Sequence, residues 1–238
     1  MYFDPLYWLM IGAGLALSLW AQFRVKSTFS KYSRMATSSG MTGAQVAQRI
    51  LADHQISGVR IEPIAGQLTD HYDPRSRTLR LSEPVYESRS MAAVGVAAHE
   101  VGHAIQHKTS YRPLGFRSAW VPVANLGSGL SMFVIMGALM AGGTATALGS
   151  NLAWLGILMF ATTTVFTLVT LPVEFDASRR ALATLERGGY LSPPEITGAR
   201  KVLNAAALTY VAAFVTSLLT LGYWALRLGL LGGRDDRR

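Results

Sequence analysis

Two long stretches without a charged side chain constrain the possible folds of this chain more than any other feature. Residues 118–173 are 56 consecutive positions, and residues 202–226 another 25, without Asp, Glu, Lys or Arg. A water-soluble domain rarely leaves such gaps, whereas a helix that crosses the hydrocarbon core of a bilayer needs roughly 20 mostly apolar residues. We therefore expect an integral membrane protein, with the lipid bilayer as its first partner.

Four segments are long and apolar enough to cross a bilayer, and they cover residues 6–23, 118–140, 151–171 and 205–226. Trp8 and Trp20 lie near the ends of the first segment, where aromatic side chains favour the membrane interface. No basic segment precedes it and no small-residue cleavage site follows it, so we expect an uncleaved span and not a signal peptide. The sequence thus predicts a mainly α membrane protein with about four transmembrane helices.

The basic residues predict how these helices are oriented. They are concentrated in residues 24–117 and 174–204, whereas the short connection between the second and third spans has none. By the positive-inside rule both basic regions face the cytoplasm, and both termini then lie outside. The net charge of +8 does not indicate nucleic-acid binding, because no run of interleaved basic and aromatic residues is present and cations that face anionic lipid account for it.

The first basic region contains signals for several small elements. Thr42 and Gln45 form a capping box that opens an amphipathic helix over residues 42–54. Alternation predicts a strand at residues 59–64, and a turn at Asp73-Pro74 predicts a hairpin between residues 67–72 and 78–82. An Ala-rich stretch without proline then predicts a helix over residues 91–107.

That last helix carries the sequence His99-Glu100-Val101-Gly102-His103. Two residues four positions apart project from one face of a helix, so the imidazoles of His99 and His103 can converge on one ion. Glu100 points aside, where it can reach a water molecule at the metal. This is the HExxH arrangement of zinc peptidases, and it predicts zinc as the cofactor; the alternative is a pair of ordinary core or interface histidines.

A catalytic zinc site needs a third protein ligand. A third histidine six residues after His103 is absent, and His107 is expected to lie too far round the helix, at a surface or interface. The remaining candidate is Glu174, just after Pro172, where we expect a new helical turn to begin. A carboxylate at the mouth of a membrane span is costly unless paired or metal-bound, although an interfacial glutamate solvated by headgroups is the alternative.

Asp176 lies two residues beyond the expected third ligand. It can support the metal ligands from outside, or pair with Arg179 or Arg180 on the same helix face. We expect the supporting role.

Four blocks of the chain resemble a known family, the YugP-like neutral zinc metallopeptidases of bacterial membranes. They are residues 68–74 (LTDHYDP), 95–106 (GVAAHEVGHAIQ), 170–178 (TLPVEFDAS) and 209–212 (TYVA). The resemblance implies a proteolytic enzyme in the inner (plasma) membrane of a bacterium, acting on a polypeptide that is itself membrane-associated.

The third block is also distantly similar to the glutamate motif of CAAX-processing membrane metallopeptidases, whose glutamate completes a gluzincin site. That resemblance implies that Glu174 is a metal ligand. The fifth position of the motif is usually an Asp that orients a zinc-bound histidine. It is Ser178 here, and this departure leaves open which residue orients the histidine, with Asp176 and Ser178 as the candidates.

The residue types define a mechanism. Glu100 is expected to take the proton of the attacking water and pass it to the leaving amine. The developing oxyanion needs a further donor, for which His71, Tyr72 and Tyr210 are the candidates. The expected function is a membrane-embedded zinc endopeptidase with its site at the cytoplasmic face. A zinc-dependent hydrolase of a non-peptide substrate and a non-catalytic, zinc-stabilised membrane adaptor are the alternatives, and the sequence does not indicate an oligomeric state.

These expectations divide the chain into six parts. They are a first transmembrane helix (1–23), a cytoplasmic catalytic region with a zincin-like HExxH helix and a small β-hairpin (24–117), two transmembrane helices (118–173), a cytoplasmic segment with the third ligand (174–204), a fourth transmembrane helix (205–228) and a flexible tail (229–238).

Overall fold

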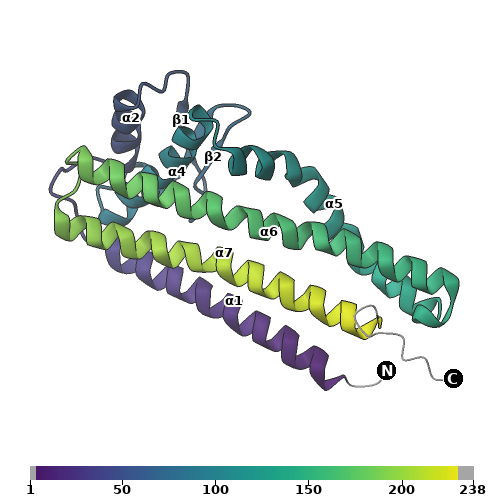
Figure 1. Ribbon diagram of the computed structural model, residues 1–238. Coiled ribbons are helices and arrows are strands. Elements are labelled where there is room, and N and C mark those ends of the chain that lie inside the picture. The colour runs from purple at the N-terminus through teal and green to yellow at the C-terminus, as the bar shows by residue number, and fades with distance from the viewer. Residues whose placement is uncertain (1–3, 230–238) are drawn as a thin grey trace. The chain divides into compact units, whose positions relative to one another are not determined.

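Four long helices dominate the computed structural model, which describes residues 4–229 (Figure 1). They are α1 (Pro5–Tyr32), α5 (Arg112–Met140), α6 (Ala147–Arg187) and α7 (Pro193–Arg227). Each is long and apolar enough to cross a membrane, so the four spans and the mainly α fold predicted from the sequence are confirmed. The tail expected to be flexible lies, beyond Gly229, outside the described residues.

The chain divides into two compact units. The first unit comprises Met1–Leu19, Phe116–Thr170 and Tyr210–Arg238, and the second comprises Trp20–Gly115 and Leu171–Thr209. All four long helices contribute residues to both units.

The first unit has the character of a membrane-embedded helix bundle. Large apolar side chains such as Leu9 and Phe133 are 69% and 75% exposed, which is costly in water but normal against lipid. The helices approach closely at small residues, since a Cβ added at Gly127 would lie 2.3 Å from the carbonyl oxygen of Met159. Membrane helices commonly pack through such small residues.

A three-stranded sheet lies in the second unit, with β1 (Arg60–Ile64), β2 (His71–Asp73) and β3 (Thr78–Ser82) in the order β1-β3-β2. The predicted hairpin is present as the antiparallel pair β2 and β3. Strand β1 pairs with β3 in parallel, a partner that alternation alone could not identify.

Strand β2 begins later than predicted, at His71. The carboxylate of Asp70 accepts hydrogen bonds from the backbone N–H and the hydroxyl of Ser82, and Leu68 adopts a positive φ of 58°. This local arrangement replaces the ladder hydrogen bonds that a longer strand would have formed.

Three short helices complete the second unit: α2 (Gly43–Asp53), α3 (Glu83–Tyr86) and α4 (Met91–Lys108). Helix α2 begins with the predicted capping box, in which Thr42 and Gln45 exchange side-chain and backbone hydrogen bonds. Helix α4 matches the predicted HExxH helix, and Ser90 caps its first turn. The core between them is apolar, with Ile50, Leu79 and Val101 almost fully buried.

The structure corrects one prediction in α6. We expected Pro172 to mark the start of a new helical turn, but α6 is continuous from Ala147 to Arg187 with Pro172 inside it. Proline removes one backbone hydrogen bond, a loss that membrane helices tolerate more readily than soluble ones. Residues 174–178 therefore lie on the same helix as the third apolar segment.

Candidate metal centre

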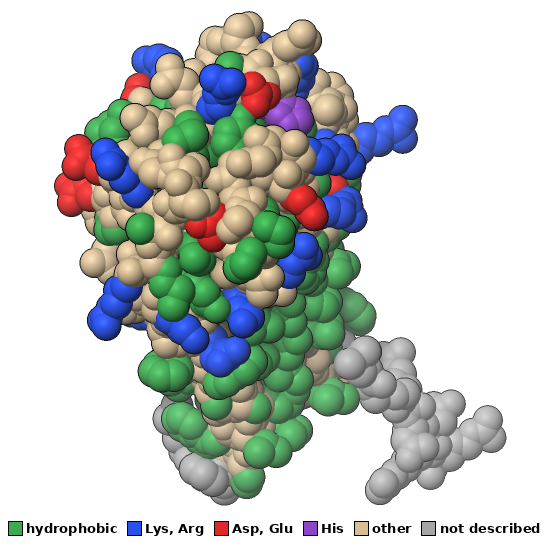
Figure 2. Space-filling view, turned by 90° about the vertical axis from the view of Figure 1, so that its left-hand side faces the viewer, with side chains coloured by type: hydrophobic (Ala, Val, Ile, Leu, Met, Phe, Trp, Pro, Cys, Tyr) green, Lys and Arg blue, Asp and Glu red, His purple; other side chains and the backbone are tan. Residues whose placement is uncertain are grey.

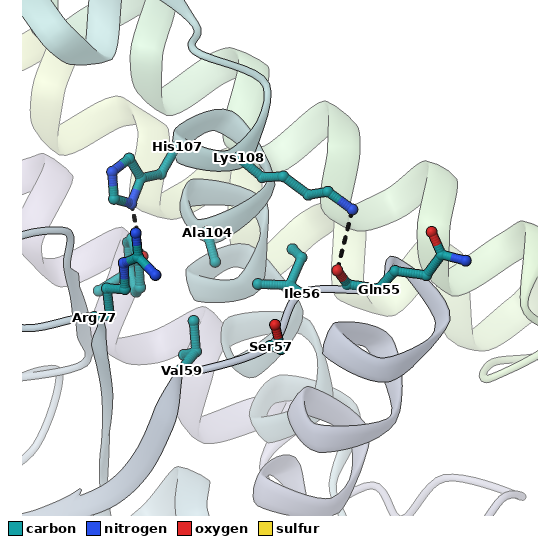
Figure 3. Close-up of a pocket in the computed structure, with 9 residues that line it drawn as sticks. Gln55, Ile56, Ser57, Val59, Arg77, Ala104, His107 and Lys108 are labelled. Carbon is teal, nitrogen blue, oxygen red and sulfur yellow. Dashed lines mark hydrogen bonds between the residues drawn. The ribbon is translucent and has the colours of Figure 1, made fainter.

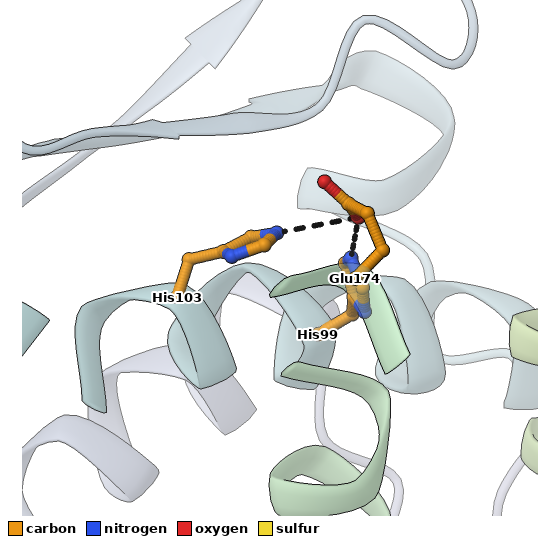
Figure 4. A group of neighbouring side chains, drawn as sticks. All are labelled: His99, His103 and Glu174. Carbon is orange, nitrogen blue, oxygen red and sulfur yellow. Dashed lines mark hydrogen bonds and ion pairs between the residues drawn. The ribbon is translucent and has the colours of Figure 1, made fainter. Parts of the chain in front are cut away.

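His99 and His103 on α4 and Glu174 on α6 point towards one another within the second unit (Figure 4). One ligand atom from each side chain lies within 4.8 Å of the other two. Oε2 of Glu174 is 3.2 Å from Nε2 of His99 and 3.6 Å from Nε2 of His103. The structure thus brings together the three residues that the sequence predicts as zinc ligands.

This cluster is mostly buried. The side chains of Glu174 and His103 are only 3% and 9% exposed, and that of His99 is 12% exposed. A buried carboxylate beside two imidazoles is costly unless they share a proton or a cation. A divalent ion would satisfy all three groups at once.

Hydrogen bonds define which nitrogen of His103 faces the cluster. Nδ1 of His103 lies 3.0 Å from Oε1 of Gln106. The amide nitrogen of Gln106 donates to the carbonyl oxygen of Val173 and to Asp176, so the amide oxygen faces the imidazole and accepts a hydrogen bond from its ring N–H. Nδ1 of His103 therefore carries the hydrogen, and the lone pair of Nε2 is directed at the ligand site.

His99 is oriented in the same way by a different partner. Its Nδ1 lies 3.1 Å from the hydroxyl oxygen of Ser178, which can accept the ring N–H and so leave Nε2 with its lone pair. The structure places Ser178 at the point where the sequence predicts an orienting residue.

Asp176 takes both of the roles considered from the sequence, support of a metal ligand and pairing with arginine. Its carboxylate pairs with Arg179 and Arg180, and it also accepts from Gln106, which contacts His103. Gln106 is a residue of the site that sequence reasoning missed. Its signal is an amide three residues after His103, and the side chain is fully buried.

Glu100 lies on α4 between the two histidines and is only 7% exposed. Burial raises the pKa of its carboxyl group, while His99 and His103 oppose that rise. Two further carboxylates, Glu174 and Asp70, act in the same direction as burial. A carboxyl group with a raised pKa is suited to exchanging protons near neutral pH.

The three candidate oxyanion donors occupy different places. His71 lies in β2, with Nδ1 2.8 Å from the carbonyl oxygen of Thr69 and Nε2 3.4 Å from the Arg80 guanidinium. Tyr72 lies beside it on β2. Tyr210 lies on α7 in the first unit. A donor role for each stays a prediction.

His107 lies outside the metal cluster and beside a separate pocket of about 300 Å³ (Figure 3). Its Nδ1 is 2.9 Å from the hydroxyl of Tyr72, a bond that connects α4 to β2. Ala104 and Arg77 also line this pocket. His107 is thus half-buried and bonded to the sheet, and it lies outside the cluster as expected.

The ligand set fits zinc. Two imidazole nitrogens and one carboxylate oxygen are a common catalytic zinc donor set that leaves a fourth position open. The hydrogen bonds to the two Nδ1 atoms direct both Nε2 lone pairs inward, as metal-bound histidines require.

Four membrane-spanning helices and a buried His-His-Glu cluster define a membrane protein with a zinc-type metal centre. The family described as "Putative neutral zinc metallopeptidase" matches residues 7–229, and the chain belongs to this family. It is 48% identical over 224 residues to "Putative membrane protease YugP" of Bacillus subtilis (strain 168), across 94% of this chain and 96% of that protein. No solved structure matches the chain. The family and the zinc cofactor expected from the sequence are thereby confirmed.

Proposed function

We propose that this protein is a zinc endopeptidase of the gluzincin type that hydrolyses peptide bonds of membrane or membrane-proximal polypeptides at the cytoplasmic face. One observation carries the proposal: the ligand atoms of His99, His103 and Glu174 converge, and a buried Glu100 lies on α4 beside the two histidines. A purely structural metal site needs no such carboxyl group. Membership of a zinc metallopeptidase family, and a relative named as a membrane protease, support peptide hydrolysis.

The roles of the residues follow from their positions. His99 and His103 would hold zinc through Nε2, and Glu174 would hold it through its carboxylate. When bound, zinc would supply the Lewis acidity that acidifies water and polarises a scissile carbonyl. Glu100 accepts a proton from the attacking water and donates it to the leaving amine.

The residues around the ligands keep them in place. Ser178 fixes the ring of His99, and Gln106 fixes that of His103. Orienting groups of this kind hold the metal ligands in the geometry that binding requires.

The sheet offers a way to position an extended polypeptide. In the order β1-β3-β2, strand β2 is an edge, and the Tyr72–His107 bond connects it to the metal-binding helix. An extended segment adds to such an edge through backbone hydrogen bonds. This mode suits a polypeptide substrate, whose backbone repeats the required donors and acceptors. His71, Tyr72 and Tyr210 remain the candidate donors to the oxyanion.

The distribution of basic residues supports the orientation. All residues of the metal centre belong to the second unit, whose segments carry most of the Lys and Arg of the chain. Positively charged segments next to membrane spans are retained in the cytoplasm. The proposed location is the inner membrane of a bacterial cell, with the site facing inward.

The decisive experiment compares zinc-loaded wild type with Glu100→Gln, using Glu87→Gln as the matched control because Glu87 is exposed and lies outside the cluster. Each protein is purified in detergent, its zinc content is measured, and a defined peptide pool is digested and analysed by mass spectrometry. We expect Glu100→Gln to keep its zinc and to lose cleavage by about 100-fold or more. The control should behave like wild type.

Two results would overturn the proposal. Equal turnover by wild type and Glu100→Gln would remove Glu100 as the base. A zinc-loaded wild type that leaves every peptide intact but hydrolyses lipid esters or small amides would identify a hydrolase of non-peptide substrates.

A further inference from the structure

A basic groove between α1 and α7 lies in the second unit, apart from the metal centre. Its volume is about 610 Å³, within the range of small-molecule sites. We call it the α1/α7 groove, and its polar lining includes Arg24, Ser27, Thr28 and Lys31 from α1 with Lys201 and Asn204 from α7.

The spacing of these residues explains why they share one groove. Arg24, Thr28 and Lys31 follow one another at intervals of four and three, which places them on one face of a helix. Lys201 and Asn204 are three apart on α7 and line the facing wall. The groove is therefore bordered by cations on both sides.

No acidic side chain neutralises these cations. Within residues 4–229, no carboxylate forms an ion pair with Arg24, Lys31 or Lys201, although the ammonium of Lys31 lies over the ring of Tyr32. The nearest acidic residue of α7 in the sequence, Glu195, is engaged by Ser38 and Ser192. On the face shown in Figure 2, several Lys and Arg side chains lie next to hydrophobic side chains. The groove thus has an uncompensated positive charge.

The groove occurs where two apolar segments end. Arg24 directly follows Phe23, the last residue of the first predicted span, and Lys201 directly precedes the 25 uncharged positions of residues 202–226. On each helix taken by itself, these residues lie at the level where hydrocarbon gives way to lipid headgroups. Leu208, one turn beyond Asn204, adds an apolar wall at the membrane end.

We propose that the α1/α7 groove binds the headgroup of an anionic phospholipid. Arg24, Lys31 and Lys201 contact the negatively charged phosphate, the hydroxyl of Thr28 and the amide of Asn204 donate hydrogen bonds to headgroup oxygens, and the acyl chains begin beside Leu208. A charge-assisted contact of this kind is stronger than one between neutral groups. The inference does not depend on the proposed peptidase activity.

The test measures lipid binding directly on the full chain. Detergent-purified protein is titrated with phosphatidylglycerol or with the zwitterionic phosphatidylcholine, and bound lipid is counted by native mass spectrometry. We compare wild type with the triple variant Arg24→Gln, Lys31→Gln, Lys201→Gln. The matched control is Lys26→Gln, Arg34→Gln, Arg200→Gln, which removes equal charge from exposed neighbours that do not line the groove.

We expect one phosphatidylglycerol to bind wild type in preference to phosphatidylcholine. Each removed groove cation should weaken the binding of phosphatidylglycerol by about fivefold. The triple variant should therefore lose affinity on the order of 100-fold, whereas the affinity of the control changes much less. The three single variants, each measured separately, give the same answer if the triple variant is unstable, and zinc content verifies folding.

Three outcomes would overturn the inference. Equal losses in the groove and control variants would indicate general surface attraction without a site. Equal binding of both lipids would exclude recognition of negative charge. Displacement of phosphatidylglycerol by an equal concentration of inorganic phosphate would show that the groove recognises a free anion and not a lipid.

Discussion

Gly102 on α4 faces the backbone of Ala177 on α6 so closely that a Cβ at position 102 would lie 2.5 Å from the carbonyl oxygen of Ala177. Only a hydrogen atom fits at this point. The two helices that carry the proposed metal ligands therefore approach each other one residue before His103 and three residues after Glu174. Glycine inside the HExxH sequence is what permits α4 to lie this close to α6.

Replacing Gly102 by Ala should therefore weaken zinc binding. The added methyl group would clash with backbone atoms of Ala177, which cannot move aside as a side chain can. The helices α4 and α6 must therefore separate by a few tenths of an ångström or more. Such overpacking costs about 1–3 kcal/mol, and it moves the histidines away from Glu174. We expect a lower thermal unfolding temperature and weaker zinc retention in a chelator competition.

The control for this variant is Gly115→Ala. Gly115 is also helical, but nothing lies within 4 Å of the position its Cβ would take. Alanine there should be neutral or slightly stabilising because it favours helix more than glycine does. Equal zinc retention by both variants would show that close approach of α4 and α6 is not needed.

Gln106→Met tests the hydrogen-bond chain behind His103. Methionine has a similar length but removes the hydrogen bonds that Gln106 makes with Nδ1–H of His103, the carbonyl of Val173 and the carboxylate of Asp176. Loss of an orienting partner of a metal-bound histidine typically weakens metal affinity about 10- to 100-fold. We expect a shift of this size in zinc affinity, measured by competition with a chelator.

A matched substitution distinguishes orientation from general destabilisation. Gln48 is exposed on α2, so Gln48→Met changes the same atoms at a site without these bonds. It should retain wild-type affinity. If Gln106→Met bound zinc as tightly as wild type, orientation of His103 through Gln106 would be excluded.

Glu174→Gln tests the third ligand. The change keeps the shape of the side chain but removes the negative charge that faces both Nε2 atoms. We expect most of the zinc to be lost on dialysis, as measured by elemental analysis. Glu186→Gln, on an exposed position of the same helix, should keep the wild-type stoichiometry. A full complement of zinc in Glu174→Gln would move the third ligand elsewhere.

The parts of this site that sequence could predict are those set by local geometry. His99 and His103 lie within one helix, so their spacing alone places them on one face. The chemistry of zinc then required a further ligand, and Glu174 was available beyond an apolar segment. Pro172 misled the prediction of a new helical turn because proline usually ends soluble helices, whereas α6 continues through it.

The parts that sequence could not predict depend on contacts between distant segments. Gln106 bonds to Val173 and Asp176, 67 and 70 positions away, and no local pattern specifies such partners. The parallel pairing of β1 with β3 could not be predicted either, because alternation identifies a strand but not the strand beside it. Sequence predicted which three side chains converge, whereas the bonds that orient His103 required the three-dimensional structure.

The orientation of the protein in the membrane can be tested directly because the chain contains no cysteine. Gln48 is exposed in the second unit, and Thr144 is exposed in the turn between α5 and α6. Gln48→Cys and Thr144→Cys each give a single labelling site.

In cells of a bacterial host, a membrane-impermeant maleimide should label Thr144→Cys while the inner membrane is intact. It should label Gln48→Cys only after that membrane is permeabilised, because the positive-inside rule retains the basic second unit in the cytoplasm. The reverse pattern would place the metal centre on the outer side, where no cytoplasmic polypeptide could reach it.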